Sequence, residues 1–158
     1  AIISMEDGEF FFHKGIDWDE LNAAIKQNHR RRVLRGGSTI TMQLAKNLFF
    51  TTEKSIIRKG KEIITALRME KELSKKTLLQ DYINAAEWGE SIFGIQAASK
   101  EYFHKKPDEI NIYECSRLAA VLPSPLIHPP DKNSRYVLRR ASIIRGRLND
   151  IILFPDGE

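Results

Sequence analysis

A chain of 158 residues with 42% hydrophobic and 29% charged residues has the composition of one globular domain, and nothing in it suggests a second. This composition excludes an intrinsically disordered chain, and no stretch approaches the 18 apolar residues of a membrane-spanning helix. The formal net charge is +4, and Cys115 is the only cysteine, so no disulfide or cysteine-based metal site can form within the chain.

The apolar pattern predicts an almost entirely helical chain, because residues recur at helical spacing and alternating strand patterns are scarce. Asn111 followed three residues later by Glu114 resembles a capping box. The four prolines of residues 123–131 predict a loop, since proline removes a backbone donor and resists helix. The expected helices cover residues 21–32, 44–50, 55–72, 75 to about 88, 95 to about 103, 112 to about 122, and 133–149.

The positive charge is concentrated in the first half of the chain. Residues 1–79 contain 15 Lys/Arg and 10 Asp/Glu, whereas residues 80–158 contain 10 and 11. Between Lys26 and Lys61 there are ten Lys/Arg and a single acid, Glu53. This bias predicts an anionic partner, and a phosphate-bearing substrate, a membrane surface and a nucleic acid all fit it.

Two adjacent carboxylates, Glu6 and Asp7, precede this basic region. A carboxylate beside a phosphorylated leaving group is typical of a general base acting on a nucleophile. Taken alone, a carboxylate such as Glu6 is more often a surface acid near a helix start. Asp7 either positions Glu6 or a loop N–H, or caps a helix.

The segment GGSTITMQLAKN, residues 36–47, is the most distinctive in the chain. A Gly-Gly-Ser-Thr turn presents backbone N–H groups and hydroxyls, and the neighbouring cations raise the local potential. That combination suits a phosphate or pyrophosphate. The substrate-binding candidates in and after this segment are Gly37, Ser38, Thr39, Gln43, Lys46 and Lys54.

A second cationic segment, RKGKE, covers residues 58–62. Spacings of four and three residues place Arg58 and Lys59 on the same helix face as Glu62. Alone, such a cluster is most often a solvated salt-bridge network of little energetic value. Because the GGST turn is in the same short chain, we interpret both cations as pyrophosphate ligands, with Glu62 orienting them or helping to bind a metal.

Five blocks, in this order, resemble the peptidoglycan glycosyltransferases of family 51. The family pattern ED-x-x-F-x-x-H-x-G-x-D is present at residues 6–17, and RKxKE at residues 58–62. Its GGSTITQQLAKN is present at residues 36–47 with one change. Two further blocks, at residues 80–103 and 117–125, resemble its Y-L-N…G…G-x-x-A-A-x-x-Y-F and R-x-A-x-L-A-x-L-P-x-x-P segments. The short chain most resembles the monofunctional biosynthetic members.

The resemblance implies an all-α, two-lobed, lysozyme-like fold, with a larger head lobe and a smaller jaw lobe facing the membrane. It implies one glycosyltransferase domain over residues 1–158, with a transmembrane helix expected upstream. The implied reaction polymerises lipid II with inversion and releases undecaprenyl pyrophosphate, while Glu6 takes the proton of the acceptor 4-hydroxyl. Met42 replaces the first Gln of the family's pair, which puts one polar contact in doubt.

The resemblance also implies partners and a location. The partners are lipid II, the growing lipid-linked glycan, a membrane surface and moenomycin-type inhibitors, without nucleic acid. The location is the bacterial inner membrane, with the catalytic domain on its periplasmic face. No obligatory cofactor is evident, although the resemblance allows a divalent cation such as Mg²⁺ near Glu62 and the pyrophosphate.

An apolar patch beside the two cationic segments has two interpretations. It is either a core helix or a surface that dips into a bilayer, where neighbouring basic residues meet anionic lipid heads. Its members are Leu48, Phe49, Phe50, Ile56 and Ile57.

Two other classes of protein stay open at this stage. A lytic transglycosylase or muramidase would cut the same polymer, but it has no need for the cationic cluster. A basic helical nucleic-acid binder would explain the charge and bind with a steep salt dependence, but it gives GGSTIT and the paired acids no role.

Overall fold

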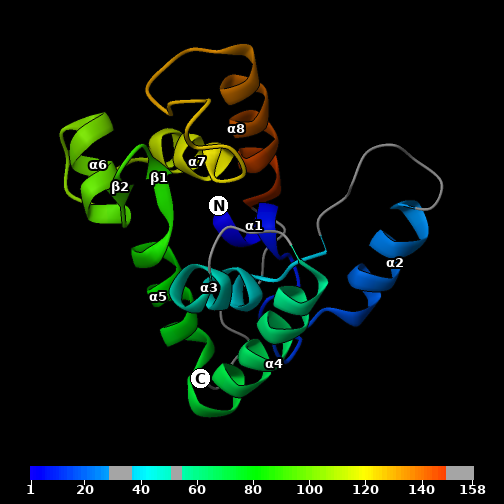
Figure 1. Cartoon of the computed structure of the whole chain (residues 1–158). Coiled ribbons are helices and arrows are strands. Elements are labelled where there is room, and N and C mark those ends of the chain that lie inside the picture. The colour runs from blue at the N-terminus through cyan, green and yellow to red at the C-terminus, as the bar shows by residue number, and fades with distance from the viewer. Residues whose placement is uncertain (29–36, 51–54, 149–158) are drawn as a thin grey trace. The chain divides into compact units, whose positions relative to one another are not determined.

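The structure is a computed structural model that describes residues 1–28, 37–50 and 55–148. In those residues it contains eight helices and one short two-stranded sheet, which confirms the expected all-α class (Figure 1). The elements form two compact units. The α3 unit comprises residues 9–82, and the α7 unit comprises residues 1–8 with residues 83–158. None of the described helices is both long and apolar enough to cross a membrane.

Every helix of the α3 unit is preceded by a side-chain oxygen that accepts a hydrogen bond from a backbone N–H in the first turn. Such oxygens satisfy donors that have no partner within the helix. The capping residues are Asp17 for α2 (Trp18–Asn28), Thr39 for α3 (Ile40–Phe49), Ser55 for α4 (Ile56–Glu72) and Ser74 for α5 (Lys75–Ala85).

The caps explain where the predicted helix boundaries are wrong. Helix α3 begins at Ile40 rather than residue 44. The Thr39 hydroxyl accepts a hydrogen bond from the N–H of Met42 and so caps the helix at this earlier position. Helix α2 begins at Trp18 rather than Leu21. Its predicted end, residues 29–32, lies outside the described residues. The prediction for α4 is confirmed, with Ser55 as its cap.

The core of the α3 unit joins α3 to α4, which pack against each other (Figure 1). Ile16, Met42 and Ala66 form a buried cluster, with Leu21 and Ile63 packed against it. Met42 is fully buried, so the residue that departs from the family pattern fills the core of this unit.

In the α7 unit, α7 (Ile112–Val121) packs along α8 (Arg135–Arg147), and α1 (Ile2–Glu6) contacts both (Figure 1). Small side chains on α7 and α8 allow this close approach. The buried residues of this cluster are Ala119, Ala120, Ala141 and Ile144, against which Ala1, Ile2 and Met5 pack.

The capping box at the start of α7 is confirmed. Asn111 Oδ1 accepts from the N–H groups of Tyr113 and Glu114, and the Glu114 carboxylate accepts from the N–H of Asn111. A hydrogen bond donated by Lys105 lowers the pKa of Glu114. The cap and the ion pair together fix the segment that enters α7.

The prediction of a helix from residue 75 to about 88 is wrong at its C-terminal end. Helix α5 stops at Ala85, and β1 (Glu87–Gly89) pairs with β2 (Ile92–Phe93) as an antiparallel hairpin. Gly89 is required there, because a Cβ would lie 2.0 Å from the hydroxyl oxygen of Tyr102. Gly94 then adopts φ +81° and precedes α6 (Ile95–Phe103), which is the expected helix.

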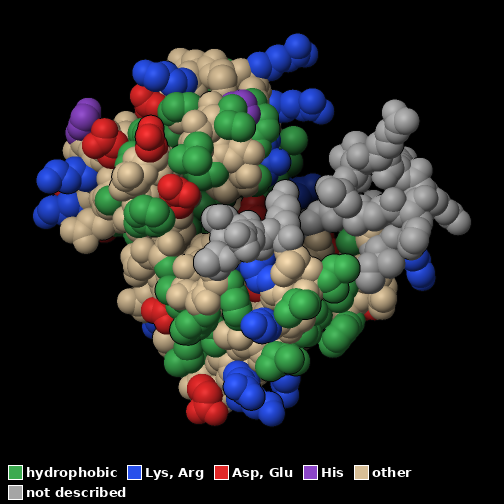
Figure 2. Space-filling view, viewed as in Figure 1, with side chains coloured by type: hydrophobic (Ala, Val, Ile, Leu, Met, Phe, Trp, Pro, Cys, Tyr) green, Lys and Arg blue, Asp and Glu red, His purple; other side chains and the backbone are tan. Residues whose placement is uncertain are grey.

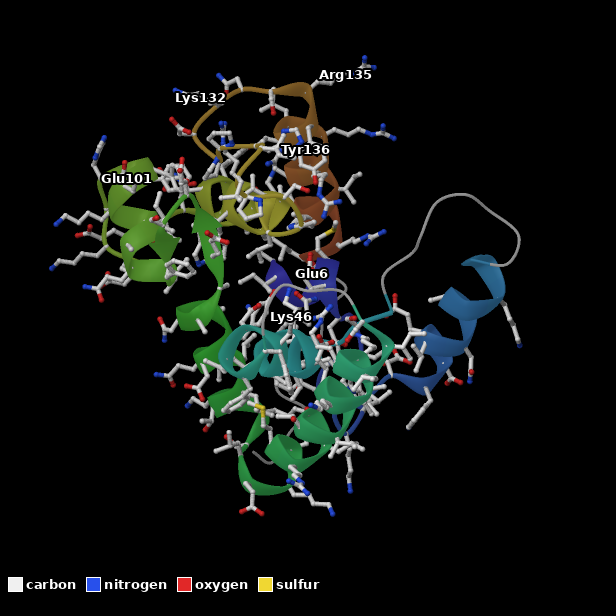
Figure 3. All side chains as sticks on the ribbon, in the orientation of Figure 1. Glu6, Lys46, Glu101, Lys132, Arg135 and Tyr136 are labelled. Atoms are coloured by element: carbon white, nitrogen blue, oxygen red, sulfur yellow. The ribbon has the colours of Figure 1, made fainter. Side chains whose placement is uncertain are left out.

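The proline-rich loop is confirmed, and one arginine holds it. Arg117 donates from Nε to the carbonyl of Pro130, from Nη2 to the carbonyl of Lys132 and from Nη1 to Asn133 Oδ1. Lys132 and Arg135 lie on either side of the turn into α8 (Figure 3). The last predicted helix is confirmed as α8, which begins at Arg135 rather than residue 133. Residue 149, its predicted end, lies outside the described residues.

Candidate active site

The predicted site residues are divided between the two units. Glu6 and Asp7 belong to the α7 unit. The remaining candidates belong to the α3 unit, where α3 and α4 carry most of them. Lys54 lies outside the described residues.

Glu62 is the centre of the cationic group on α4. It is 2% exposed, and its Oε1 accepts a hydrogen bond from Nη1 of Arg58 while its Oε2 lies 3.2 Å from Nζ of Lys59. The predicted shared helix face is therefore confirmed. Because Glu62 is buried, the group is not an ordinary solvated salt-bridge network, in which both partners stay in water.

The charges of this group do not cancel. One carboxylate compensates one of the two cations, so the group retains one positive charge. The Nε of Arg58 is also buried without a hydrogen-bond partner among the described residues. A buried unpaired donor beside surplus positive charge suits an anionic oxygen.

The Gly-Gly-Ser-Thr segment joins this group through Ser38. Nζ of Lys59 donates to Oγ of Ser38 at 2.5 Å, which ties the start of α3 to α4 across 21 residues of sequence. Ser38 and Lys59, predicted separately from two motifs, are therefore brought together. The N-terminus of a helix presents free N–H groups and a positive dipole, which adds to the favourable potential for an anion.

Thr39 and Gly37 have structural partners inside the unit. The Thr39 hydroxyl donates to the carbonyl of Gly15 at 2.6 Å and caps α3, and the residue is only 4% exposed. A Cβ on Gly37 would lie 3.2 Å from Cβ of Ala24 and 3.3 Å from Cα of Leu21. The contacts within the unit therefore account for a threonine at position 39 and a glycine at position 37. The role of both residues in substrate binding stays a prediction.

Gln43 and Lys46 follow on α3, one turn apart. Gln43 Oε1 accepts from the Tyr82 hydroxyl at 2.9 Å, and its Nε2 reaches the carbonyl of Ser38 at 3.4 Å. These contacts fix the orientation of the Gln43 amide. Lys46 is exposed and projects from α3 (Figure 3).

Glu6 is the last residue of α1, so the alternative interpretation as an acid near a helix start is wrong. It is partly exposed (Figure 3), whereas Asp7 is 2% exposed and its backbone N–H closes the helix on the carbonyl of Ile3. Arg147 Nη1 lies 3.4 Å from the carbonyl oxygen of Ser4 and donates to it from α8. Packing on α7 and α8 therefore holds the short helix that carries Glu6.

The donor set around Glu62 does not fit a directly bound divalent cation. Both carboxylate oxygens face cationic side chains, which would repel a second cation. Within the described ranges, no group of three His, Cys, Asp or Glu residues is arranged to hold a metal ion.

The sequence motifs point neither to Glu70 nor to the contact of Tyr82 with Gln43. Glu70 accepts hydrogen bonds from Thr41 and Lys75, and Tyr82 holds Gln43. No sequence pattern distinguishes Glu70 from Glu72. The partners of Glu70 are Thr41, 29 residues before it, and Lys75, five residues after it, and neither spacing is a helical repeat.

Comparison with known proteins agrees with the motifs. Residues 1–149 match the family described as Transglycosylase. A biosynthetic peptidoglycan transglycosylase of Pasteurella multocida (strain Pm70) is 43% identical over 148 residues, which are 94% of this chain and 60% of that protein. Proteins of the same name from Janthinobacterium sp. (strain Marseille) and Herminiimonas arsenicoxydans are 39% and 40% identical, over 97% and 94% of this chain.

The chain spans 60% to 67% of the length of these three relatives. The matched residues nevertheless include both units and all five blocks. The chain therefore belongs to the transglycosylase family, the family 51 glycosyltransferases that its motifs resemble.

Proposed function

We propose that this chain is a peptidoglycan glycosyltransferase domain that polymerises lipid II into glycan strands. The observation that carries the proposal is the buried Glu62 with its two cations and Ser38. This group has surplus positive charge and a buried donor that has no partner among the described residues. Such a group suits a diphosphate leaving group. The relatives are named as biosynthetic peptidoglycan transglycosylases, which supports a lipid-linked glycan as the substrate.

In the proposed reaction, Glu6 acts as the general base. It takes the proton from the 4-hydroxyl of the acceptor sugar, and that oxygen attacks the anomeric carbon of the lipid-linked donor. The new C–O bond forms as the bond from the anomeric carbon to the diphosphate oxygen breaks. This single displacement inverts the configuration and releases undecaprenyl pyrophosphate.

Arg58 and Lys59 are proposed to act on the leaving group. Negative charge grows on the diphosphate as the bond to carbon breaks, and fixed cations stabilise that charge without having to reorganise. Glu62 holds the cations in place and limits the surplus to one positive charge. A diphosphate screened in this way leaves without being protonated.

The lytic alternative fits this arrangement less well. A glycosidase has to protonate an alkoxide leaving group, so it needs a carboxylic acid that carries a proton. Such an enzyme has no need for fixed cations, whereas both oxygens of Glu62 face the cationic side chains of Arg58 and Lys59. The cationic group thus favours transfer from a diphosphate over cleavage of a glycan.

We also propose that the apolar patch faces the bilayer. Leu48, Phe49, Ile56 and Ile57 are 49%, 61%, 92% and 75% exposed, and Phe50 is half-buried. Figure 2 shows hydrophobic side chains gathered on the surface of the α3 unit with Lys and Arg among them. Exposed apolar side chains beside cations suit an interface with anionic lipids. The proposed setting is the periplasmic face of the inner membrane, with moenomycin-type inhibitors as ligands of the same site.

The direct test of the proposed function is to incubate the protein with lipid II in detergent or vesicles and resolve the products by size. Polymer formation with release of undecaprenyl pyrophosphate supports the proposal. Shortening of preformed glycan strands, with lipid II unused, would assign the chain to the lytic class instead.

Glu6→Gln keeps the shape of the side chain and removes the proton acceptor. Polymerisation should fall by about 10²–10⁴-fold, the range for loss of a general base. Circular dichroism should be unchanged. Glu9→Gln, an exposed acid three residues away, is the matched control and should keep wild-type activity. If Glu6→Gln kept more than about a tenth of the wild-type rate, Glu6 would not be the base.

Lys59→Ala should slow turnover by roughly 10²-fold, because the ammonium acts on charge that develops as the diphosphate leaves. Glu62→Gln should have a similar effect, since Arg58 and Lys59 lose the carboxylate that orients them. Turnover is measured well below the melting temperature, with Lys71→Ala as an exposed control on the same helix. If these variants showed normal turnover and a lowered melting temperature, the ion pairs of Glu62 would have only a structural role.

Replacing Phe49 and Ile56 together with Ser should weaken co-sedimentation with anionic liposomes and leave the melting temperature nearly unchanged. Both side chains are already exposed, whereas truncating a buried aromatic residue typically costs about 3–5 kcal/mol. Leu126→Ser with Ile127→Ser removes two side chains of comparable exposure, 62% and 72%, from the α7 unit and should not affect sedimentation. Loss of the fold in the first variant, or equal loss of binding in both, would contradict the membrane-facing role.

A further inference from the structure

A buried ion pair lies in the α3 unit away from the cationic group of Glu62. Glu70 is in the last turn of α4, and its side chain is 6% exposed. Its Oε1 accepts from the hydroxyl of Thr41 at 2.6 Å and from Nζ of Lys75 at 2.8 Å. The Lys75 side chain is 11% exposed, and Thr41 is fully buried.

The pair joins segments that are distant in the sequence. Nζ of Lys75, at the start of α5, lies 4.5 Å from the ring centroid of Phe10, which is fully buried in the first motif. Gly15, in the same motif, passes so close to Glu70 that a Cβ would lie 3.1 Å from its Cγ. The Glu70 carboxylate thus contacts α3 and the start of α5, and its Cγ lies beside the first motif.

Stability alone is a poor explanation for such a pair. Removing two charges from water is costly, and well-packed apolar residues of similar size often give equal or greater stability. A carboxylate that accepts from two fixed donors does, however, define the orientation of both donors. The directional contacts therefore point to a geometric role.

The geometry of α3 shows what the pair holds. At about 100° per residue, Thr41 lies roughly 140–160° around the helix from Gln43 and Lys46. Glu70 therefore tethers α3 from the face opposite those two candidates for substrate binding. At the start of α3, Ser38 is tied to Lys59 on α4. With both attachments to α4, α3 cannot roll about its axis without breaking one of them.

We propose that Glu70 and Lys75 are positioning residues that fix the roll of α3 through Thr41, so that Gln43 and Lys46 are held toward the substrate. This inference rests on the proposed function, because it treats α3 as the helix that meets the donor diphosphate. Neither residue touches substrate in this account. Their effect reaches the reaction through the orientation of α3.

The test uses Thr41→Val, which is nearly isosteric and removes only the hydroxyl, and Thr41→Ser, which restores it. Thr41→Val should lower kcat/KM for lipid II by about 10- to 100-fold, since a small displacement of positioning groups has effects of this size. Thr41→Ser should recover most of the loss. Ser99→Ala removes another fully buried hydroxyl, whose partner is the carbonyl of Ile95 in α6, and should stay near wild type.

A second readout does not depend on polymerisation. Binding of inorganic pyrophosphate, measured by calorimetry, should weaken about tenfold in Thr41→Val and stay unchanged in Thr41→Ser and Ser99→Ala. If wild-type protein binds pyrophosphate but makes no polymer, the proposed function fails, while this comparison still decides the positioning role. Wild-type kcat/KM and pyrophosphate binding in a folded Thr41→Val variant would overturn the inference.

A further variant covers the case in which Thr41→Val does not fold. Glu70→Met combined with Lys75→Met removes both charges and the oxygen that accepts from the Thr41 hydroxyl, so no unpaired buried charge remains. This variant should fold and show the same loss of kcat/KM and of pyrophosphate affinity. A folded double variant with wild-type values for both would overturn the positioning role.

Discussion

The α3 unit depends on one interaction, the burial of the Glu62 carboxylate between two cations of its own helix. A buried carboxylate has to be paired, since leaving one charge of such a pair without its partner typically costs about 3–5 kcal/mol. Arg58 and Lys59 meet this requirement, and Lys59 extends the contact to Ser38 at the start of α3. Because the buried charge of Glu62 has to be compensated, it sets the positions of both cations and, through Lys59, of the Ser38 hydroxyl. We propose that these groups receive the diphosphate.

The Gly-Gly-Ser-Thr segment has a structural role as well as its proposed binding role. Thr39 caps α3 and donates to Gly15, Thr41 donates to Glu70, and Met42 fills the core. These three side chains face the interior of the unit, whereas Ser38 faces the cationic group. An apolar residue at position 42 is thus compatible with the proposed reaction, because that side chain packs against Ile16 and Ala66.

The features predicted correctly from the sequence are those governed by local rules. The shared face of Arg58, Lys59 and Glu62 follows from helical spacing, and the capping box before α7 follows from an Asn and a Glu three residues apart. The family motifs named the correct family. These features need no knowledge of contacts between distant segments.

The features that the sequence did not reveal depend on long-range contacts. The hairpin that ends α5 early requires Gly89 because the Tyr102 hydroxyl lies against it, 13 residues further along the chain. The link from Thr41 to Glu70 spans 29 residues. In both cases, the deciding partner is brought close only by folding. The early start of α3 is different, because its cap is a local contact in which the Thr39 hydroxyl accepts from the N–H of Met42, three residues further on.

We propose that Glu62 organises Arg58, Lys59 and Ser38 into a diphosphate site. The most direct measurement is a crystal structure of the protein with inorganic pyrophosphate bound. We expect phosphate oxygens within hydrogen-bond distance of Arg58 and Lys59, with Nε of Arg58 donating to one of them and the contacts of Glu62 preserved. Pyrophosphate bound only elsewhere, for example at the arginines of α8, with the Glu62 group unchanged, would show that Glu62 does not organise a diphosphate site.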